Sequence, residues 1–158
     1  MVIVDGHNLL HTVCKLEEYK SVGDVQLCRI VGRYLKQVGE KGEIVFDGTG
    51  PRDKSGFDNV TNLEVTFAGQ GADADTVIEG RIKASTGPRR LTVVSTDRRL
   101  RVAAQKRRAT IVKSHVFWSD VQKQLRQKKK TIKEPTEKVI GLSEGEAEQW
   151  LKLFHIEQ

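Results

Sequence analysis

The chain has 158 residues, a hydrophobic content of 37% and a net charge of +6, which indicates one folded domain with a full core and excludes a wholly disordered chain. No apolar run approaches the roughly 20 residues that span a bilayer, and the chain opens on a strand-like run, so we expect neither a membrane segment nor a signal peptide. Cys14 and Cys28 have no CxxC spacing, which argues against a disulfide framework or a zinc site and favours a reducing, cytoplasmic setting.

The charge is distributed unevenly along the chain. Residues 81–133 hold 17 Lys and Arg against two acidic residues, a net charge of +15, whereas the remainder has a net charge of −9. A basic segment of this size favours a polyanionic partner, most simply nucleic acid. The alternative is that these charges only keep helix faces and a tail in contact with water.

The first predicted element is a buried strand that ends in a carboxylate. The β-branched residues 2–4 are followed by Asp5 and Gly6. A strand that is apolar on both faces is typical of a parallel sheet covered by helices on both sides. Asp5 then lies at the carboxyl edge of the sheet, where open α/β sheets place their ligands.

The rest of the first 127 residues alternates between helical and strand patterns. This alternation predicts a doubly wound parallel sheet in a three-layer α/β/α arrangement. In chain order we expect a helical turn or loop at 9–21, a helix at 24–38, a strand at 43–46, a turn-rich loop at 48–62, a strand at 63–67, a helix that starts near residue 73 or 75, a strand at 91–96, a helix at 98–107, a short strand at 111–112 and a helix from about residue 116.

The last part of the chain is predicted to lie outside this domain of residues 1–127. We expect a basic, polar linker at 128–141 and an amphipathic helix at 142–158, which the capping-box pair Ser143 and Glu146 introduces. The sequence leaves open whether this helix packs on the domain, forms a dimer or docks a partner such as a ribonucleoprotein.

Two further predicted strands also end in a carboxylate. Asp47 follows the strand at 43–46, and Asp97 follows the strand at 91–96. Because neighbouring parallel strands lie about 4.8 Å apart, their terminal acids are expected to meet Asp5 at one edge. Like charges that close repel unless a cation neutralises them. The pattern predicts a hard divalent ion, Mg²⁺ or Mn²⁺, although each acid alone also suits a turn or a helix N-cap.

Four motifs, VIVDGHNLL, IVFDG, GADADTVIE and VVSTD, occur in this order within residues 1–125. Together they resemble the YacP-like branch of the NYN ribonucleases, within the PIN-like nuclease superfamily. This resemblance implies a three-layer α/β/α domain with an acidic metal site that cleaves RNA. It implies Asp5, Asp75 and Asp97 as the catalytic acids, since the family pattern A-D-x-x-I-E fits Asp75 better than Asp73. The late fourth acid of many PIN domains has no clear counterpart here, and Asp120 is only a weak candidate.

The sequence leaves open whether RNA is cut internally, as by an endonuclease, or from an end, and whether the protein associates with ribosomes or forms a dimer. We therefore predict a Mg²⁺- or Mn²⁺-dependent ribonuclease that hydrolyses RNA. Its metal would lower the pKa of a bound water and polarise the phosphate, and the resemblance implies 5′-phosphate and 3′-hydroxyl products. The alternatives are a catalytically silent RNA-binding module and a nucleotide-binding α/β protein, although no GxGxxG or Walker loop follows the first strand. The predicted metal ligands are Asp5, Asp47, Asp73, Asp75 and Asp97, and the predicted substrate contacts are Asn8, Ser95, Thr96, Arg98, Arg99 and Arg101.

Overall fold

The fold is built on one five-stranded sheet in which every strand pair is parallel, in the order β3–β2–β1–β4–β5. The computed structural model describes residues 1–132, with side chains through residue 127. This topology confirms the predicted doubly wound α/β arrangement and puts β1 at the centre. The strands are β1 (Val2–Asp5), β2 (Gly42–Phe46), β3 (Leu63–Phe67), β4 (Thr92–Val94) and β5 (Thr110–Val112).

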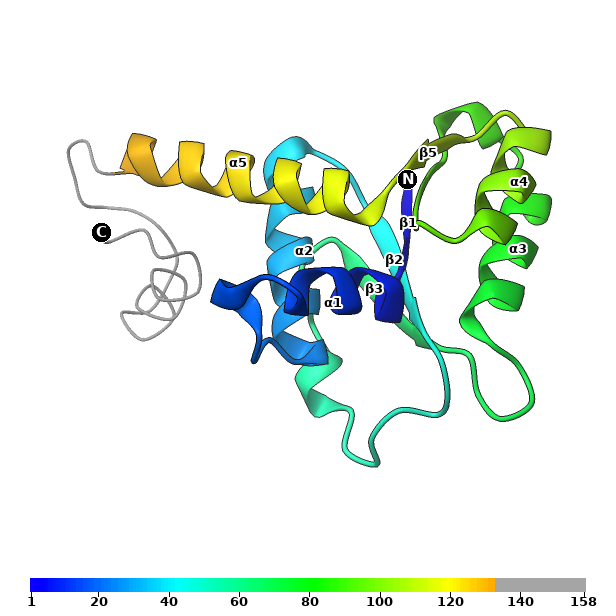
Figure 1. The fold of residues 1–158 in the computed structure, drawn as a ribbon, viewed down its shortest axis with the longest axis horizontal. Helices are drawn as coiled ribbons and strands as arrows, with labels where there is room; N and C mark the ends of the chain where they lie inside the picture. Colours follow the sequence, from blue (N-terminus) through cyan, green and yellow to red (C-terminus); the bar gives the residue numbers. More distant parts are fainter. Residues whose placement is uncertain (133–158) are drawn as a thin grey trace.

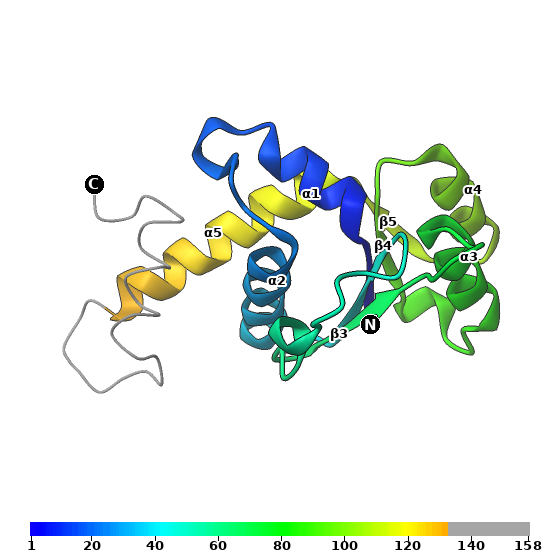
Figure 2. The same ribbon diagram turned by 90° about the horizontal axis from the view of Figure 1, so that it is seen from below.

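Helices cover both faces of the sheet. On one side lie α1 (Gly6–Cys14), α2 (Asp24–Val38) and α5 (Ser114–Ile132), and on the other lie α3 (Ala74–Ala84) and α4 (Arg98–Lys106), as Figure 1 and Figure 2 show. Three short 3₁₀ turns complete the described elements: η1 (Glu17–Tyr19), η2 (Ser55–Phe57) and η3 (Pro88–Arg90). None of the helices within residues 1–132 has both the length and the apolar character that crossing a bilayer requires.

β1, β2, β4 and β5 contribute side chains to two separate cores because successive residues point to opposite faces. Val2 and Val4 of β1 belong to the core under α1, α2 and α5, whereas Ile3 between them belongs to the core under α3 and α4. This double burial is the physical reason for the uninterrupted apolar runs in the sequence. It also leaves the strand ends as the place where polar side chains from several strands can meet.

Two helices differ from the sequence-based expectation. A helix, α1, begins directly after Asp5, where the pattern from residue 9 indicated only a helical turn or loop. The Asp5 carboxylate caps this helix by accepting from the Asn8 backbone N–H at 3.4 Å. The last helix, α5, begins at Ser114 and continues through the lysine run at 128–130. The predicted helix at 142–158 lies outside the described residues.

Gly6 allows the turn between β1 and α1 to press against the end of β2. A Cβ atom at this position would lie 2.5 Å from two atoms of the Phe46 ring, a distance that carbon atoms do not tolerate. Only glycine fits without displacing that ring. The close approach holds the end of β1, with Asp5, beside the end of β2, where Asp47 follows.

Candidate active site

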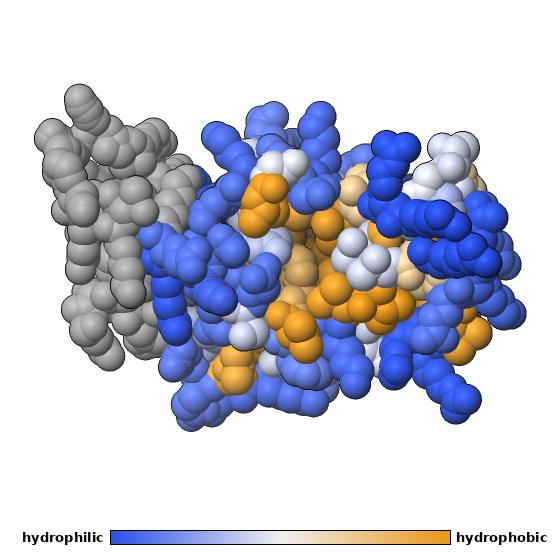
Figure 3. Space-filling view, turned by 90° about the horizontal axis from the view of Figure 1, so that it is seen from above, coloured by the Kyte–Doolittle hydropathy of each residue, from blue (hydrophilic) through white to orange (hydrophobic). Residues whose placement is uncertain are grey.

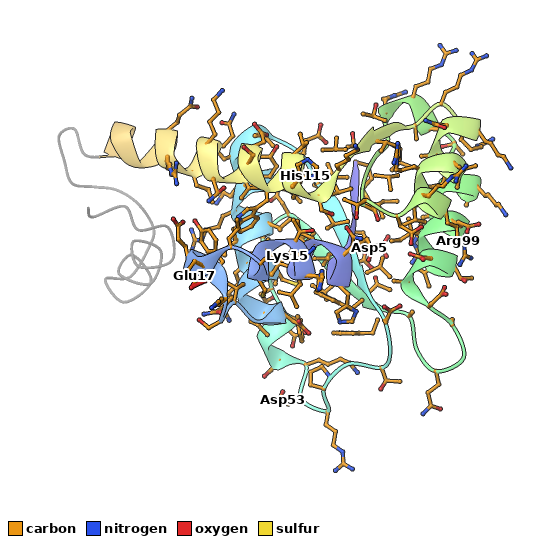
Figure 4. The ribbon with its side chains drawn as sticks, viewed as in Figure 1. Asp5, Lys15, Glu17, Asp53, Arg99 and His115 are labelled. Atoms are coloured by element: carbon orange, nitrogen blue, oxygen red, sulfur yellow. The ribbon has the colours of Figure 1, made fainter. Side chains whose placement is uncertain are left out.

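Four aspartates gather at the carboxyl edge of the sheet. Asp5 ends β1, Asp47 follows β2, and Asp97 follows β4 as the N-cap of α4. Asp75 reaches the same edge from the first turn of α3. Because β2 and β4 are the two neighbours of β1, the strand order itself brings the first three acids together. Figure 4 shows Asp5 at the junction of β1 and α1.

Asp5 is the most buried of the four, with a relative exposure of 6%. Burial raises the pKa of its carboxyl above the usual value, and the negative charges of Asp47 and Asp97 raise that pKa further. Hydrogen bonds from the Asn8 backbone and the Ser95 hydroxyl act in the opposite direction and favour the charged form. The result is a desolvated carboxylate at the centre of an acidic group.

Among the neighbouring acids, Asp97 has the strongest effect on the carboxyl of Asp75. Burial and the charges of Asp97 and then Asp5 raise the pKa of Asp75 to about 6. The Asp97 side chain also lies within hydrogen-bonding reach of the Asp75 carboxyl. The Asp97 Oδ1 atom accepts from the Arg99 backbone N–H at 2.7 Å. Two carboxyl groups crowded in this way form a position where positive charge is favoured.

Asp47 and Asp73 lie at the rim of this group and serve as helix caps. Asp47 Oδ1 accepts from the Ala74 backbone N–H at 2.7 Å, and its Oδ2 lies 3.3 Å from His7 Nδ1. Asp73 is the N-cap of α3 and accepts from the Thr76 backbone N–H at 2.8 Å. Both side chains therefore position the start of α3, and with it Asp75.

Ser95 joins the two central acids. Its hydroxyl is fully buried, donates to Asp5 Oδ2 at 3.2 Å and accepts from the Asp97 backbone N–H at 3.0 Å. One side chain therefore sets the orientation of the Asp5 carboxylate and the backbone that carries Asp97. Ser95 was predicted as a substrate contact, and the structure instead buries its side chain between the two acids.

Replacing Ser95 by alanine is expected to lower the free energy of unfolding by about 1–3 kcal/mol, because the buried partners lose this hydrogen bond. The pKa of Asp5 should rise further, since the serine hydroxyl favours its charged form. Urea unfolding and an NMR titration of the Asp5 carboxyl measure the two effects. Ser21→Ala, at an exposed serine, is the matched control, and equal losses in both variants would rule out the positioning role.

The carboxylates supply the oxygen donors that Mg²⁺ and Mn²⁺ prefer, but their present arrangement is not a coordination sphere. Within the described part of the chain, no group of three His, Cys, Asp or Glu side chains is arranged to hold a metal ion. Both oxygens of Asp5, and one oxygen each of Asp47 and Asp97, instead accept hydrogen bonds from hydroxyl or backbone groups. The donor chemistry fits a divalent cation, and the carboxylates would have to reorient to surround one.

Asn8 and Thr96, two of the predicted substrate contacts, bind each other. Asn8 Nδ2 lies 2.9 Å from Thr96 Oγ1, and Asn8 Oδ1 accepts from the Thr96 backbone N–H at 3.1 Å. The same oxygen accepts from the Ser114 hydroxyl at 2.5 Å. The amide therefore ties the start of α1 to the end of β4 and to α5. Ser114 is not among the residues predicted from the sequence, because no local pattern links Asn8 to a residue 106 positions away.

The three predicted arginines differ in their surroundings. Arg99 forms an ion pair with Glu79 and lies 3.6 Å from Asp73, so it links α4 to α3. Figure 4 shows Arg99 on the α3 and α4 side of the sheet. Arg98 is exposed, and Arg101 is partly buried. Of the three, Arg98 is the side chain that is exposed directly beside Asp97 and has no ion pair among the described residues.

Two solved structures have a similar fold. A crystal structure titled Rae1 (YacP) from Bacillus subtilis matches with a TM-score of 0.69 and 19% identity, covering 83% of this chain and 78% of that chain. A structure of its W164L mutant matches with a TM-score of 0.61 and 21% identity, covering 97% and 91%.

A comparison with curated proteins found no match. The family model described as the YacP-like NYN domain, however, matches residues 2–154, nearly the whole chain. The parallel strand order and the acids at its carboxyl edge are consistent with this family match. The chain belongs to the YacP-like NYN domain family.

Proposed function

We propose that this protein is a divalent-metal-dependent endoribonuclease, with Asp5, Asp75 and Asp97 as its catalytic acids. The observation that carries the proposal is the convergence of these acids at one edge of the parallel sheet, where the charges of Asp97 and Asp5 act on the Asp75 carboxyl beside the buried Asp5. Like charges so close repel one another, and a bound cation would relieve that repulsion. Membership of the NYN family supports RNA as the substrate.

Asp5, Asp75 and Asp97 would hold the cation, with Asp47 and Asp73 as the outer acids that position α3. When bound, Mg²⁺ or Mn²⁺ supplies Lewis acidity toward a phosphate oxygen and lowers the pKa of a bound water. The two hydrogen bonds of the Ser95 hydroxyl hold the Asp5 carboxylate and the Asp97 backbone in place. The exposed Arg98 guanidinium, next in sequence to Asp97, is suited to bind the substrate phosphate.

The basic segment explains how RNA would reach this acidic edge. Phosphate contacts from Lys and Arg supply affinity without reading sequence, and that affinity falls steeply with salt. The proposal places the protein in the cytoplasm, with RNA, free or within a ribonucleoprotein such as the ribosome, as its partner.

The test is cleavage of a labelled circular single-stranded RNA. We expect linear products in Mg²⁺ or Mn²⁺ and no cutting after EDTA is added, because the acids alone cannot neutralise the attacked phosphate. Linearisation identifies internal cutting, and 5′-phosphate ends on the products identify the attack by water. RNA that is bound but stays intact with either metal would instead indicate a catalytically silent RNA-binding module.

A further inference from the structure

A hollow of about 550 Å³ lies between α3 and α4, next to the acidic edge. We call it the α3–α4 groove. Five of its eight lining residues are Lys or Arg, and only one is acidic. The lining residues are Glu79, Lys83, Arg98, Arg99, Val102, Ala103, Lys106 and Arg107.

The groove starts at the candidate active site and leads away from it. Both helices follow a loop at the carboxyl edge of the parallel sheet, so they run in the same direction, away from the four acids. Arg98 is the first residue of α4 and directly follows Asp97, whereas Lys106 is its last residue. At 1.5 Å per residue, the distance along the helix from Arg98 to Lys106 is about 12 Å.

The charge of the groove is mainly uncompensated. The acidic residue, Glu79, is already paired with Arg99. Lys83, Arg98 and Lys106 are exposed and have no ion pair among residues 1–127. Arg107 donates to the Ser85 carbonyl, which carries no net charge to neutralise it. Figure 3 shows hydrophilic surface at the end of the molecule that carries these two helices.

The floor of the groove is apolar. Val102 is 40% exposed on α4, and Ala103 lies beside it in the lining of the groove. Cations beside an apolar floor are complementary to a polymer ligand that carries regularly spaced anions and flat apolar rings. A nucleic acid strand is such a chain, with its phosphates outside and its bases able to lie on apolar surface.

We propose that the α3–α4 groove binds the RNA strand on one side of the scissile phosphate, holding about three nucleotides through their phosphates. Each nucleotide of a stacked strand advances about 3.4 Å along the strand axis, and the phosphates spread farther apart when the strand is extended, so a length of about 12 Å accommodates about three phosphates of an extended strand. The contacts are to the backbone, so the groove adds affinity without sequence preference. The inference rests on the proposed ribonuclease function and defines the path of its substrate.

The test compares two double variants. Lys83→Ala with Lys106→Ala removes two charges of the groove, and Lys36→Ala with Lys41→Ala removes two exposed charges, in the last turn of α2 and directly before β2, that do not line the groove. Fluorescence anisotropy measures binding of a 12-nucleotide single-stranded RNA, without metal, between 50 and 300 mM KCl. Cleavage of the same RNA in Mn²⁺ is measured separately.

The groove variant is expected to bind RNA roughly tenfold more weakly at 0.1 M salt, and its slope of log affinity against log salt should become shallower by about 1.4, the value for two lost phosphate contacts. The control should match the wild type. Val102→Glu, which adds a negative charge to the floor, should weaken binding as well and provides a second test. Thermal melting of each variant confirms that it folds.

Equal affinities and salt slopes for the wild type and both groove variants would overturn the proposed path. The ribonuclease proposal would survive that outcome if the wild type still cuts the RNA. Conversely, RNA that binds in the groove but stays uncut would contradict the enzymatic function and leave the groove assignment standing. The two proposals can therefore fail independently.

Discussion

Replacing Asp97 by asparagine is expected to reduce RNA cleavage by at least about two to three orders of magnitude, the scale of losing one electrostatic group aimed at a reacting centre. RNA affinity should stay close to that of the wild type. The amide is nearly isosteric, so the cap of α4 can persist while the negative charge beside Asp75 is lost. Cleavage of total RNA in Mg²⁺ or Mn²⁺ and anisotropy binding with the same preparations measure the two quantities.

Asp53→Asn is the matched control for this substitution. Asp53 also accepts a backbone hydrogen bond, from Ser55 at 3.0 Å, but it lies in the loop after β2, well away from Asp5 in Figure 4. We expect this variant to cut RNA at the wild-type rate. Unchanged cleavage by the Asp97 variant would remove Asp97 from the catalytic set, whatever the control shows.

Replacing Asp75 by asparagine is expected to abolish cleavage and, at the same time, to stabilise the metal-free protein at neutral pH. The pKa of Asp75 is raised to about 6 in the folded chain, from 3.8 for an ordinary Asp. Between about pH 4 and pH 6 the folded chain therefore binds more protons than the unfolded chain. The stability of the wild type falls as the pH rises through this window and stays reduced above it. Asparagine carries no charge and avoids this penalty.

Thermal melting in EDTA at pH 4 and pH 7.5 checks the sign of this effect. The Asp75 variant should melt at a higher temperature than the wild type at pH 7.5, and this advantage should shrink or vanish at pH 4, where both side chains are uncharged. A difference of the same size at both pH values would mean that the carboxylate is not destabilised by its neighbours. A gain of stability with a loss of activity is the trade-off expected of a functional acidic group.

Much of the fold could be predicted because the strong signals were local. Apolar β-branched runs such as residues 2–4 identify strands buried on both faces, and three- and four-residue spacing identifies helices such as α2. The structure confirms the resulting parallel sheet. The failure to predict a helix directly after Asp5 also has a local cause. The apolar pattern there is short, and the helix depends on the cap that Asp5 supplies.

The convergence of the acids could be predicted, but their partners could not. Parallel strands end at one edge, which is sufficient to expect Asp5, Asp47 and Asp97 together. The orientation of each carboxylate depends on groups that come from other elements. Ser95 reaches Asp5 across 90 residues, and Ser114 reaches Asn8 across 106. No local pattern encodes contacts of that separation.

Three features could be predicted from the sequence because each depends only on neighbouring residues. They are the ends of the strands, the acids that follow them and the excess of basic charge after residue 80. Tertiary structure alone decided which oxygens meet, which arginine is paired and where a groove opens. Arg99 and Lys83 both line the α3–α4 groove, yet Arg99 pairs with Glu79 whereas Lys83 has no ion pair among the described residues. That difference arises from the packing of α3 against α4, which brings together side chains far apart in the chain.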